Sequence, residues 1–349
     1  MIPEAEPKRP ESKERSEEPL ARFLVSSSPH VHEGSRIRDI MLLVIAALLP
    51  ASVFSVYMFG LPALFTIVLS VASAAGFEWV WQKAIRKSVT ASDGSAALTG
   101  LLLALNLPAS SPWWMILVGN LFAVVITKQF YGGIGYNIFN PALVGRVALL
   151  VAFPVHMTSR WTAPSAWGMN AVTTATPLGR AREALLSTGR IDISFTRQEA
   201  LDLLIGNRAG SLGEVSVILL LIGGVFLLAK RIITWHAPVA FIASVWAMTG
   251  IFHIADPSRY ADPSFHVLTG GLFLGAFFMA TDYVTSPLAA SGKVVFGIGC
   301  GVVTVVIRLF GAYPEGVSFA ILLMNAFTPL IDRAFKPSVF GARGTKAAA

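Results

Sequence analysis

The sequence has little charge, one cysteine and no metal-ligand motif. Only 13% of its 349 residues are charged, whereas soluble domains carry about 25%. The single cysteine, Cys300, cannot form an internal disulfide or hold an iron–sulfur cluster alone. The six histidines are scattered, with no i, i+4 pair and no metal-ligand spacing. Any cofactor must therefore be held by other chemistry.

Long apolar runs take the place of the missing charge. Hydrophobic residues make up 54% of the chain, and mean hydropathy is +0.65. Charges are concentrated in residues 1–38 and in a few short connections. Runs of about 18 or more apolar residues suit a bilayer, so the pattern predicts an all-α integral membrane protein. The net charge of +7 is typical of basic cytoplasmic loops. No basic stretch is interleaved with stacking aromatics, which argues against nucleic acid as a partner.

Ten membrane segments are expected, in two groups of five. They cover residues 41–59, 61–82, 95–108, 113–129, 140–154, 211–230, 236–255, 265–281, 293–309 and 316–332. The third and eighth are short and glycine-rich, as broken or re-entrant helices would be.

An internal repeat relates the two groups. Ser95–Leu107 resembles Phe265–Phe277, and both contain a Leu-Thr-Gly step. Phe130–Ala142 matches Phe310–Ala320 in its aromatic, glycine and proline character. With five segments in each half, the second half is inverted relative to the first, and such repeats place a site near the midplane. A chance similarity between glycine-rich apolar stretches is the alternative.

The distribution of Lys and Arg predicts both termini in the cytoplasm. The expected divisions are a cytoplasmic tail at 1–38 (disordered over 1–22), a first membrane half at 39–154, an extracytoplasmic loop at 155–210, a second half at 211–333 and a cytoplasmic tail at 334–349. The inside loops then contain Lys83, Arg86, Lys87, Lys128, Lys230, Arg231 and Lys293.

A threonine-rich segment, Asn170–Leu178, stands out in the expected external loop. Pro177 disfavours a helical conformation at Thr176, so its hydroxyl is expected to face outward, accessible to a modifying enzyme. On spacing alone, a solvated threonine-rich turn is the better reading.

Seven stretches together resemble a known family. They are Ser26–His30, Asn137–Gly145, Asn170–Leu178, Trp235–Pro238, Gly275–Asp282, Tyr313–Gly316 and Leu323–Asp332. In this order they resemble the RnfD (RsxD) component of the Rnf electron-transport complex, a relative of the NqrB component of the sodium-pumping NADH:quinone reductase (the NqrB/RnfD family). The resemblance covers about residues 23–341.

The resemblance implies a urea-transporter-like fold of two inverted five-helix halves. It also implies FMN joined through its phosphate to Thr176 by a separate flavin transferase. Two positions depart from the family pattern, since Asn170 replaces an acidic residue and Thr174 replaces a common glycine. Relatives are also thought to hold a non-covalent riboflavin, for which the sequence identifies no contacts.

The resemblance further implies a role as one component of an ion-translocating redox complex in the bacterial inner membrane. The chain would relay electrons between ferredoxin- and NAD-linked partner subunits, coupled to Na⁺ or H⁺ movement. It is not a complete enzyme alone, because it lacks a nucleotide-binding glycine loop and cluster ligands. Two alternatives stay open: a small-solute channel or transporter of urea-transporter-like fold, and a scaffold protein without a cofactor.

Candidate site residues fall into two groups. Those expected near the FMN phosphate are Thr173, Thr174, Thr176, Arg180 and Arg182. Those at membrane depth are Glu78, Asp282 and Asp332, which are ion-path candidates because ionisable groups in a bilayer are costly. No catalytic residue and no metal site are expected.

Two further patterns have structural readings. Thr196–Glu199 is a capping box that opens a short helix, with Leu201, Leu204 and Ile205 on its packing face. Trp113, Trp114 and Trp161 are typical of an interfacial aromatic belt. A flavin-stacking role for them is the alternative.

Overall fold

The described residues form a helical protein. The computed structural model describes residues 37–159, 161–164, 174–189, 195–214, 216–311 and 313–336, except the side chain of Ala91. These residues belong to a single compact unit. Within them there is an isolated bridge at Thr162 and no extended strand.

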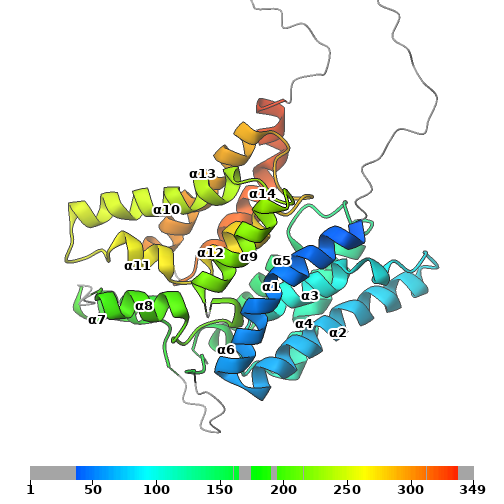
Figure 1. Ribbon diagram of the computed structural model, residues 1–349, viewed down its shortest axis with the longest axis horizontal. Helices are drawn as coiled ribbons and strands as arrows, with labels where there is room; N and C mark the ends of the chain where they lie inside the picture. Colours follow the sequence, from blue (N-terminus) through cyan, green and yellow to red (C-terminus); the bar gives the residue numbers. More distant parts are fainter. Residues whose placement is uncertain are drawn as a thin grey trace, which may run out of the picture. The chain divides into compact units, whose positions relative to one another are not determined.

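The helices follow the expected order (Figure 1). The first half contains α1 (Ile37–Phe59), α2 (Leu61–Ala84), η1 (Ala91–Asp93), α3 (Ser95–Leu105), α4 (Trp113–Asn120), the π-helix η2 (Leu121–Gln129) and α5 (Pro141–Ala152). The connection contains α6 (Pro154–Thr158), α7 (Pro177–Thr188), α8 (Arg197–Ile205) and η3 (Leu212–Glu214). The second half contains α9 (Val217–Ala229), α10 (His236–Ala255), α11 (Pro263–Leu268), α12 (Leu272–Leu274), the π-helix η4 (Gly275–Met279), α13 (Ala290–Phe310) and α14 (Val317–Ala334).

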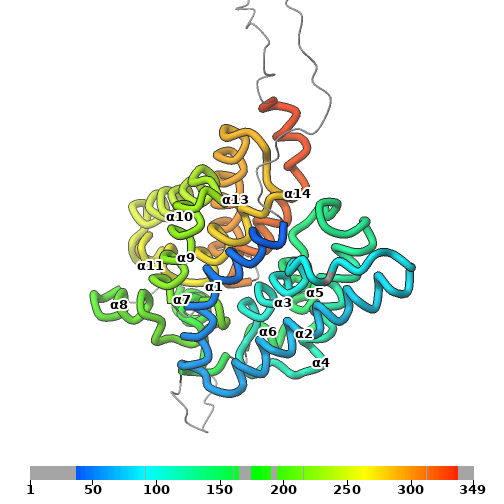
Figure 2. The backbone as a smooth tube through the Cα atoms, turned by 45° about the vertical axis from the view of Figure 1, so that its right-hand side comes forward, coloured from blue at the N-terminus to red at the C-terminus, as the bar shows by residue number. Residues whose placement is uncertain are grey.

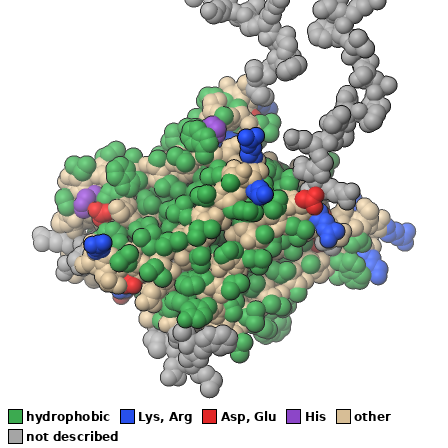
Figure 3. All heavy atoms as spheres, in the orientation of Figure 1, with side chains coloured by type: hydrophobic (Ala, Val, Ile, Leu, Met, Phe, Trp, Pro, Cys, Tyr) green, Lys and Arg blue, Asp and Glu red, His purple; other side chains and the backbone are tan. Residues whose placement is uncertain are grey.

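Each of the ten expected segments is helical in the structure. Five helices, α1, α2, α10, α13 and α14, are long and apolar enough to cross a membrane. Hydrophobic side chains cover most of the face seen in Figure 3, and charged groups lie mainly toward its edges. A multi-pass membrane protein is thereby supported, while ten full crossings and the inverted repeat stay predictions.

The two Leu-Thr-Gly steps differ in conformation. Gly100 lies inside α3, where a Cβ atom would sit 2.6 Å from the carbonyl oxygen of Ser70 on α2. Gly270 adopts φ = +71° and interrupts the eighth segment between α11 and α12. Glycine suits both positions, but for close packing in one and a left-handed backbone in the other. The expected break in the eighth segment is therefore confirmed, whereas the third is a short continuous helix.

The two halves pack directly against each other through α1 and α9 (Figures 1 and 2). A Cβ atom at Gly223 of α9 would overlap the carbonyl oxygen of Ala47 on α1. Small residues allow such close backbone approach, which supplies much of the attraction between helices in lipid.

Helix α8 begins with the expected capping box. The Thr196 hydroxyl accepts from Glu199 N–H, and the Glu199 carboxylate accepts from Thr196 N–H. The expected packing face is wrong for Leu201 and Ile205, which are exposed, whereas Leu204 is partly buried against the main core. Leu203 is the buried residue, in a cluster with Phe265 and others, because α8 packs on α11 through that side.

Substitution of Gly100 tests the contact between α2 and α3. We expect Gly100→Ala to lower the free energy of unfolding by about 1–3 kcal/mol, because the added methyl group overlaps the α2 backbone. Gly76→Ala on α2 is the control, since nothing lies within 4 Å of its added carbon. Thermal unfolding in detergent measures both, and equal midpoints for the two variants would contradict the packing argument.

Candidate functional site

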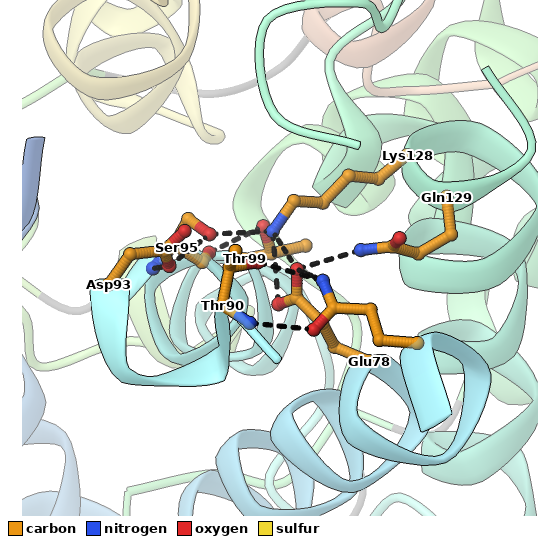
Figure 4. Close-up of polar contacts among 8 residues, drawn as sticks. Glu78, Thr90, Asp93, Ser95, Thr99, Lys128 and Gln129 are labelled. Atoms are coloured by element: carbon orange, nitrogen blue, oxygen red, sulfur yellow. Dashed lines mark hydrogen bonds and ion pairs between the residues drawn. The ribbon is translucent and has the colours of Figure 1, made fainter. Parts of the chain in front are cut away.

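A buried ion pair joins α2 and η2 in the first half. Glu78 on α2 and Lys128 on η2 are 1% and 3% exposed. The Lys128 ammonium donates to Glu78 Oε1 at 3.0 Å and to Oε2 at 3.1 Å. Gln129 and Gln82 donate to Oε1 at 2.7 Å and 3.2 Å (Figure 4). The Glu78 carboxylate is therefore neutralised and fully hydrogen-bonded.

A hydrogen-bonded chain continues from this pair toward solvent. Lys128 Nζ also donates to Ser95 Oγ at 2.6 Å, and Ser95 Oγ donates to Asp93 Oδ1 at 2.6 Å. Asp93 is half-buried, ahead of the first turn of α3. A continuous polar path thus connects the buried Glu78 to the partly exposed Asp93 (Figure 4).

The position of Lys128 corrects a sequence expectation. The Lys and Arg distribution predicts Lys128 in a solvated inside loop, whereas it is buried in η2. The π-helical turn shifts the register of the last residues of this segment, and such turns are frequent at functional sites. The sequence did contain a signal that Lys128 is buried and paired, because it lies within the apolar run 113–131, where an unpaired lysine is costly.

A cavity of about 300 Å³ borders Lys128. Its wall is mostly apolar, with contributions from α1, α3, α9 and η4. Its polar lining residues include Ser95, Thr99, Lys128, Asn137, Asn140 and Asp282. The structure therefore joins Lys128 and Asp282, from different halves, at a single cavity.

The other ion-path candidate lies apart from this cluster. Asp332 accepts from Leu288 N–H at 3.0 Å, which ties α14 to the loop before α13. Asp282 accepts from Thr285 Oγ1 at 3.1 Å. Of the three predicted carboxylates, Asp282 lines the cavity and Glu78 reaches it through Lys128, while Asp332 is not among the lining residues.

Two buried arginines hold the interrupted eighth segment. Arg308 donates to the carbonyl oxygens of His266 (2.5 Å) and Thr269 (3.1 Å), and Arg208 donates to that of Leu268 at 2.6 Å. These carbonyls belong to the end of α11, where helical partners are missing. A second set of contacts involves Arg146, which donates to Asn106 Oδ1 at 2.7 Å beyond α3 and pairs with Glu315.

The sequence reasoning missed this arginine group and the glutamates beside it. Glu214 interacts electrostatically with all three arginines. Arg146 and Arg308 each interrupt an apolar run, which was a readable signal. The sequence does not show that these arginines meet around the break at Gly270, because their meeting depends on how distant helices pack.

Thr176 is the N-cap of α7. Its backbone is extended, as Pro177 predicts, and its Oγ1 accepts from Gly179 N–H at 3.0 Å. The expectation that the hydroxyl faces outward is wrong, because Thr176 is 5% exposed and its hydroxyl caps the helix. It borders a cavity of about 20 Å³ with Arg146 and Trp161.

The remaining loop candidates are placed as follows. Thr174 is exposed and its N–H donates to Trp161 O at 2.9 Å. Arg180 is exposed and lines a different cavity, of about 400 Å³, between α7, α8 and α11. Arg182 is half-buried. Thr173 and Asn170 lie outside the described residues. The cation beside Thr176 is thus Arg146 rather than either predicted arginine.

The three tryptophans do not form one belt. Trp113 is exposed, as a belt residue would be. Trp114 is partly buried and packs edge-on against Phe153. Trp161 is buried and donates to Thr158 O at 2.9 Å, so the belt reading is wrong for it.

Removal of Arg308 tests its role at the broken helix. We expect Arg308→Met to lower the free energy of unfolding by about 3 kcal/mol or more, because two buried carbonyls lose a charged donor. The control is Arg259→Met, at an exposed position. Unfolding midpoints in detergent compare the two variants, and similar values would argue against this role.

Comparisons with known proteins identify the family. The family described as NQR2, RnfD, RnfE matches residues 24–341. The D subunit of the proton-translocating ferredoxin:NAD⁺ oxidoreductase complex of Clostridium ljungdahlii is 46% identical, over 92% of this chain and 97% of the relative. The D subunit of the Na⁺-translocating ferredoxin:NAD⁺ oxidoreductase complex of Acetobacterium woodii is 45% identical, over 91% and 95%. The D subunit of the ion-translocating oxidoreductase complex of Escherichia fergusonii is 38% identical, over 92% and 99%. The chain therefore belongs to the NQR2, RnfD, RnfE family.

Proposed function

We propose that this chain is the membrane-embedded D subunit of an ion-translocating ferredoxin:NAD⁺ oxidoreductase complex and carries FMN esterified to Thr176. The names of its relatives support the complex. The observation that supports the FMN site is the position of Thr176, whose hydroxyl lies at the N-terminus of α7 beside Arg146. The bound group supplies the electron-transfer chemistry, and the protein positions it.

The residues around Thr176 suit a phosphodiester. A helix N-terminus favours anions because its dipole is positive there. At α7 the dipole is the main contribution, because Pro177 has no N–H and Gly179 N–H already donates to Thr176 Oγ1. The Arg146 guanidinium borders the same cavity, where it donates to Asn106 and pairs with Glu315, so a phosphodiester there would compete with the Glu315 carboxylate for Arg146. A cavity of about 20 Å³ is too small for a flavin ring, so the ring would lie outside it.

The burial of Thr176 constrains how the ester forms. Its hydroxyl accepts from Gly179 N–H within the first turn of α7. A flavin transferase must reach this oxygen, so attachment has to precede the docking of α7 or open its first turn. Asn170 and Thr174 lie in the stretch such an enzyme would read.

Riboflavin is proposed as a second, non-covalent cofactor in the cavity beside Lys128. The cavity has the mostly apolar wall and the few convergent polar groups typical of ligand sites. Asn137 offers an amide group to the polar edge of a flavin ring. The Asn140 amide also lines the cavity, but it caps α5 and donates to Met279 O. Its volume of about 300 Å³ is at the lower end for ligand pockets.

The chain would act only within an assembly. Other Rnf-type subunits would carry the iron–sulfur centres and the nucleotide site, and a flavin transferase would mature the chain. We place it in the inner membrane, surrounded by lipid, with both termini in the cytoplasm. Glu78 and Asp282 are the carboxylates that we assign to the ion path.

Covalent flavin attachment is directly measurable. With a flavin transferase co-expressed, the denatured wild-type chain is expected to give a fluorescent band in a gel, and Thr176→Val is expected to abolish it. Thr188→Val is the matched control and should stay fluorescent, because it changes an exposed threonine at the other end of α7 and leaves both the Thr176 hydroxyl and the stretch Asn170–Leu178 intact. A dark wild-type band would remove covalent FMN from the proposal.

A further inference from the structure

The Lys128 ammonium lies where a monovalent cation would bind. Its Nζ is surrounded by three oxygens: Ser95 Oγ at 2.6 Å, Glu78 Oε1 at 3.0 Å and Glu78 Oε2 at 3.1 Å. Carboxylate and hydroxyl oxygens are suitable ligands for hard cations. An ammonium has three donors, and all three are used here.

We propose that Lys128 is a tethered cation that competes with the translocated cation for Glu78, and so couples that carboxylate to the neighbouring cavity. When a Na⁺ or a proton binds Glu78, the ammonium leaves and turns toward the cavity. One positive charge replaces another at the carboxylate, so Glu78 is never left bare in an apolar surrounding. The coupling rests on the proposed riboflavin in that cavity.

The burial of Glu78 makes the competition between Lys128 and another cation strong. An ion pair this deeply buried adds little stability over an apolar pair, whereas a lone buried charge costs several kcal/mol. Glu78 therefore requires a cation at all times, and Lys128 serves as that cation until another arrives. The Gln82 and Gln129 amides keep the carboxylate in place during the exchange.

The cavity is arranged to receive the displaced ammonium. Lys128 already lines it, and Asp282 is the other lining residue with a formal charge among those described. Asn137 and Thr99 add polar atoms to the wall. Helices α1 and α9 contribute only apolar side chains there, so no further cation competes for Asp282 from those helices.

Exchange at Glu78 then favours electron uptake in the cavity. A flavin bound in the cavity would gain one negative charge if it accepted one electron from a partner subunit without a proton. A released ammonium beside it stabilises that charge, and the added charge in turn draws Lys128 away from Glu78. By thermodynamic linkage each event favours the other to the same extent.

The midpoint potential of the non-covalent flavin tests this coupling. It is measured in the assembled complex against NaCl, with choline chloride holding ionic strength constant, and against pH at fixed NaCl. For one cation bound per electron, the potential rises by about 59 mV per tenfold increase in that cation. We expect such a rise along one axis in wild type, and its loss in Lys128→Met and in Glu78→Gln.

Control variants separate this role from a structural one. Lys83→Met, at an exposed lysine on α2, should keep the wild-type slope. Ser95→Ala removes one oxygen from around Nζ and should change the slope only partly. A Lys128→Met complex that retains the full wild-type slope would overturn the proposal, as would a wild type flat along both axes.

A second measurement covers the cases in which the flavin is missing or Lys128→Met does not assemble. Absence of acid-extractable riboflavin would refute the proposed cofactor, but not the competition. Thermal unfolding of the full chain then decides, because Lys128→Gln leaves Glu78 without its cation. We expect Na⁺ or acid to raise the unfolding midpoint of Lys128→Gln by several degrees more than that of wild type. Equal responses would overturn the proposal.

Discussion

A buried charge or backbone polar group in an apolar interior is costly unless it finds a partner inside the protein, and the rest of this structure depends on that constraint. The chain interrupts its eighth segment at Gly270, which leaves carbonyls without helical donors. Arg308 and Arg208 supply those donors from other elements. The break is therefore possible only because distant parts of the chain deliver two guanidinium groups to it.

The same constraint governs the buried carboxylate of the first half. Glu78 is tolerated at depth because Lys128 and two glutamine amides saturate it. A group that needs a cation permanently will bind an alternative one if it can enter. The contacts that neutralise Glu78 thus also allow Lys128 to be exchanged for another cation.

The polar groups gather in two regions joined by helix packing. One lies beside Lys128 and the 300 Å³ cavity, and the other contains Arg146 and Thr176. Glycines let these helices approach closely: Gly100 of α3 packs against the backbone at Ser70 of α2, and Gly223 of α9 packs against the backbone at Ala47 of α1. Tightly packed helices transmit small displacements, which suits a protein whose relatives are named for coupling ion movement to redox chemistry.

The sequence by itself determined the helical segments, because apolar runs and glycine or proline interruptions are local signals. It also placed Thr176 ahead of Pro177 in an extended backbone and identified the capping box at Thr196. Tertiary structure alone decided that Lys128 meets Glu78, fifty positions away, and that Arg146 rather than Arg180 borders Thr176. It also decided that Leu203, not Leu201, packs α8. Such pairings depend on which helix faces meet, and no local pattern specifies the orientation of one helix against another.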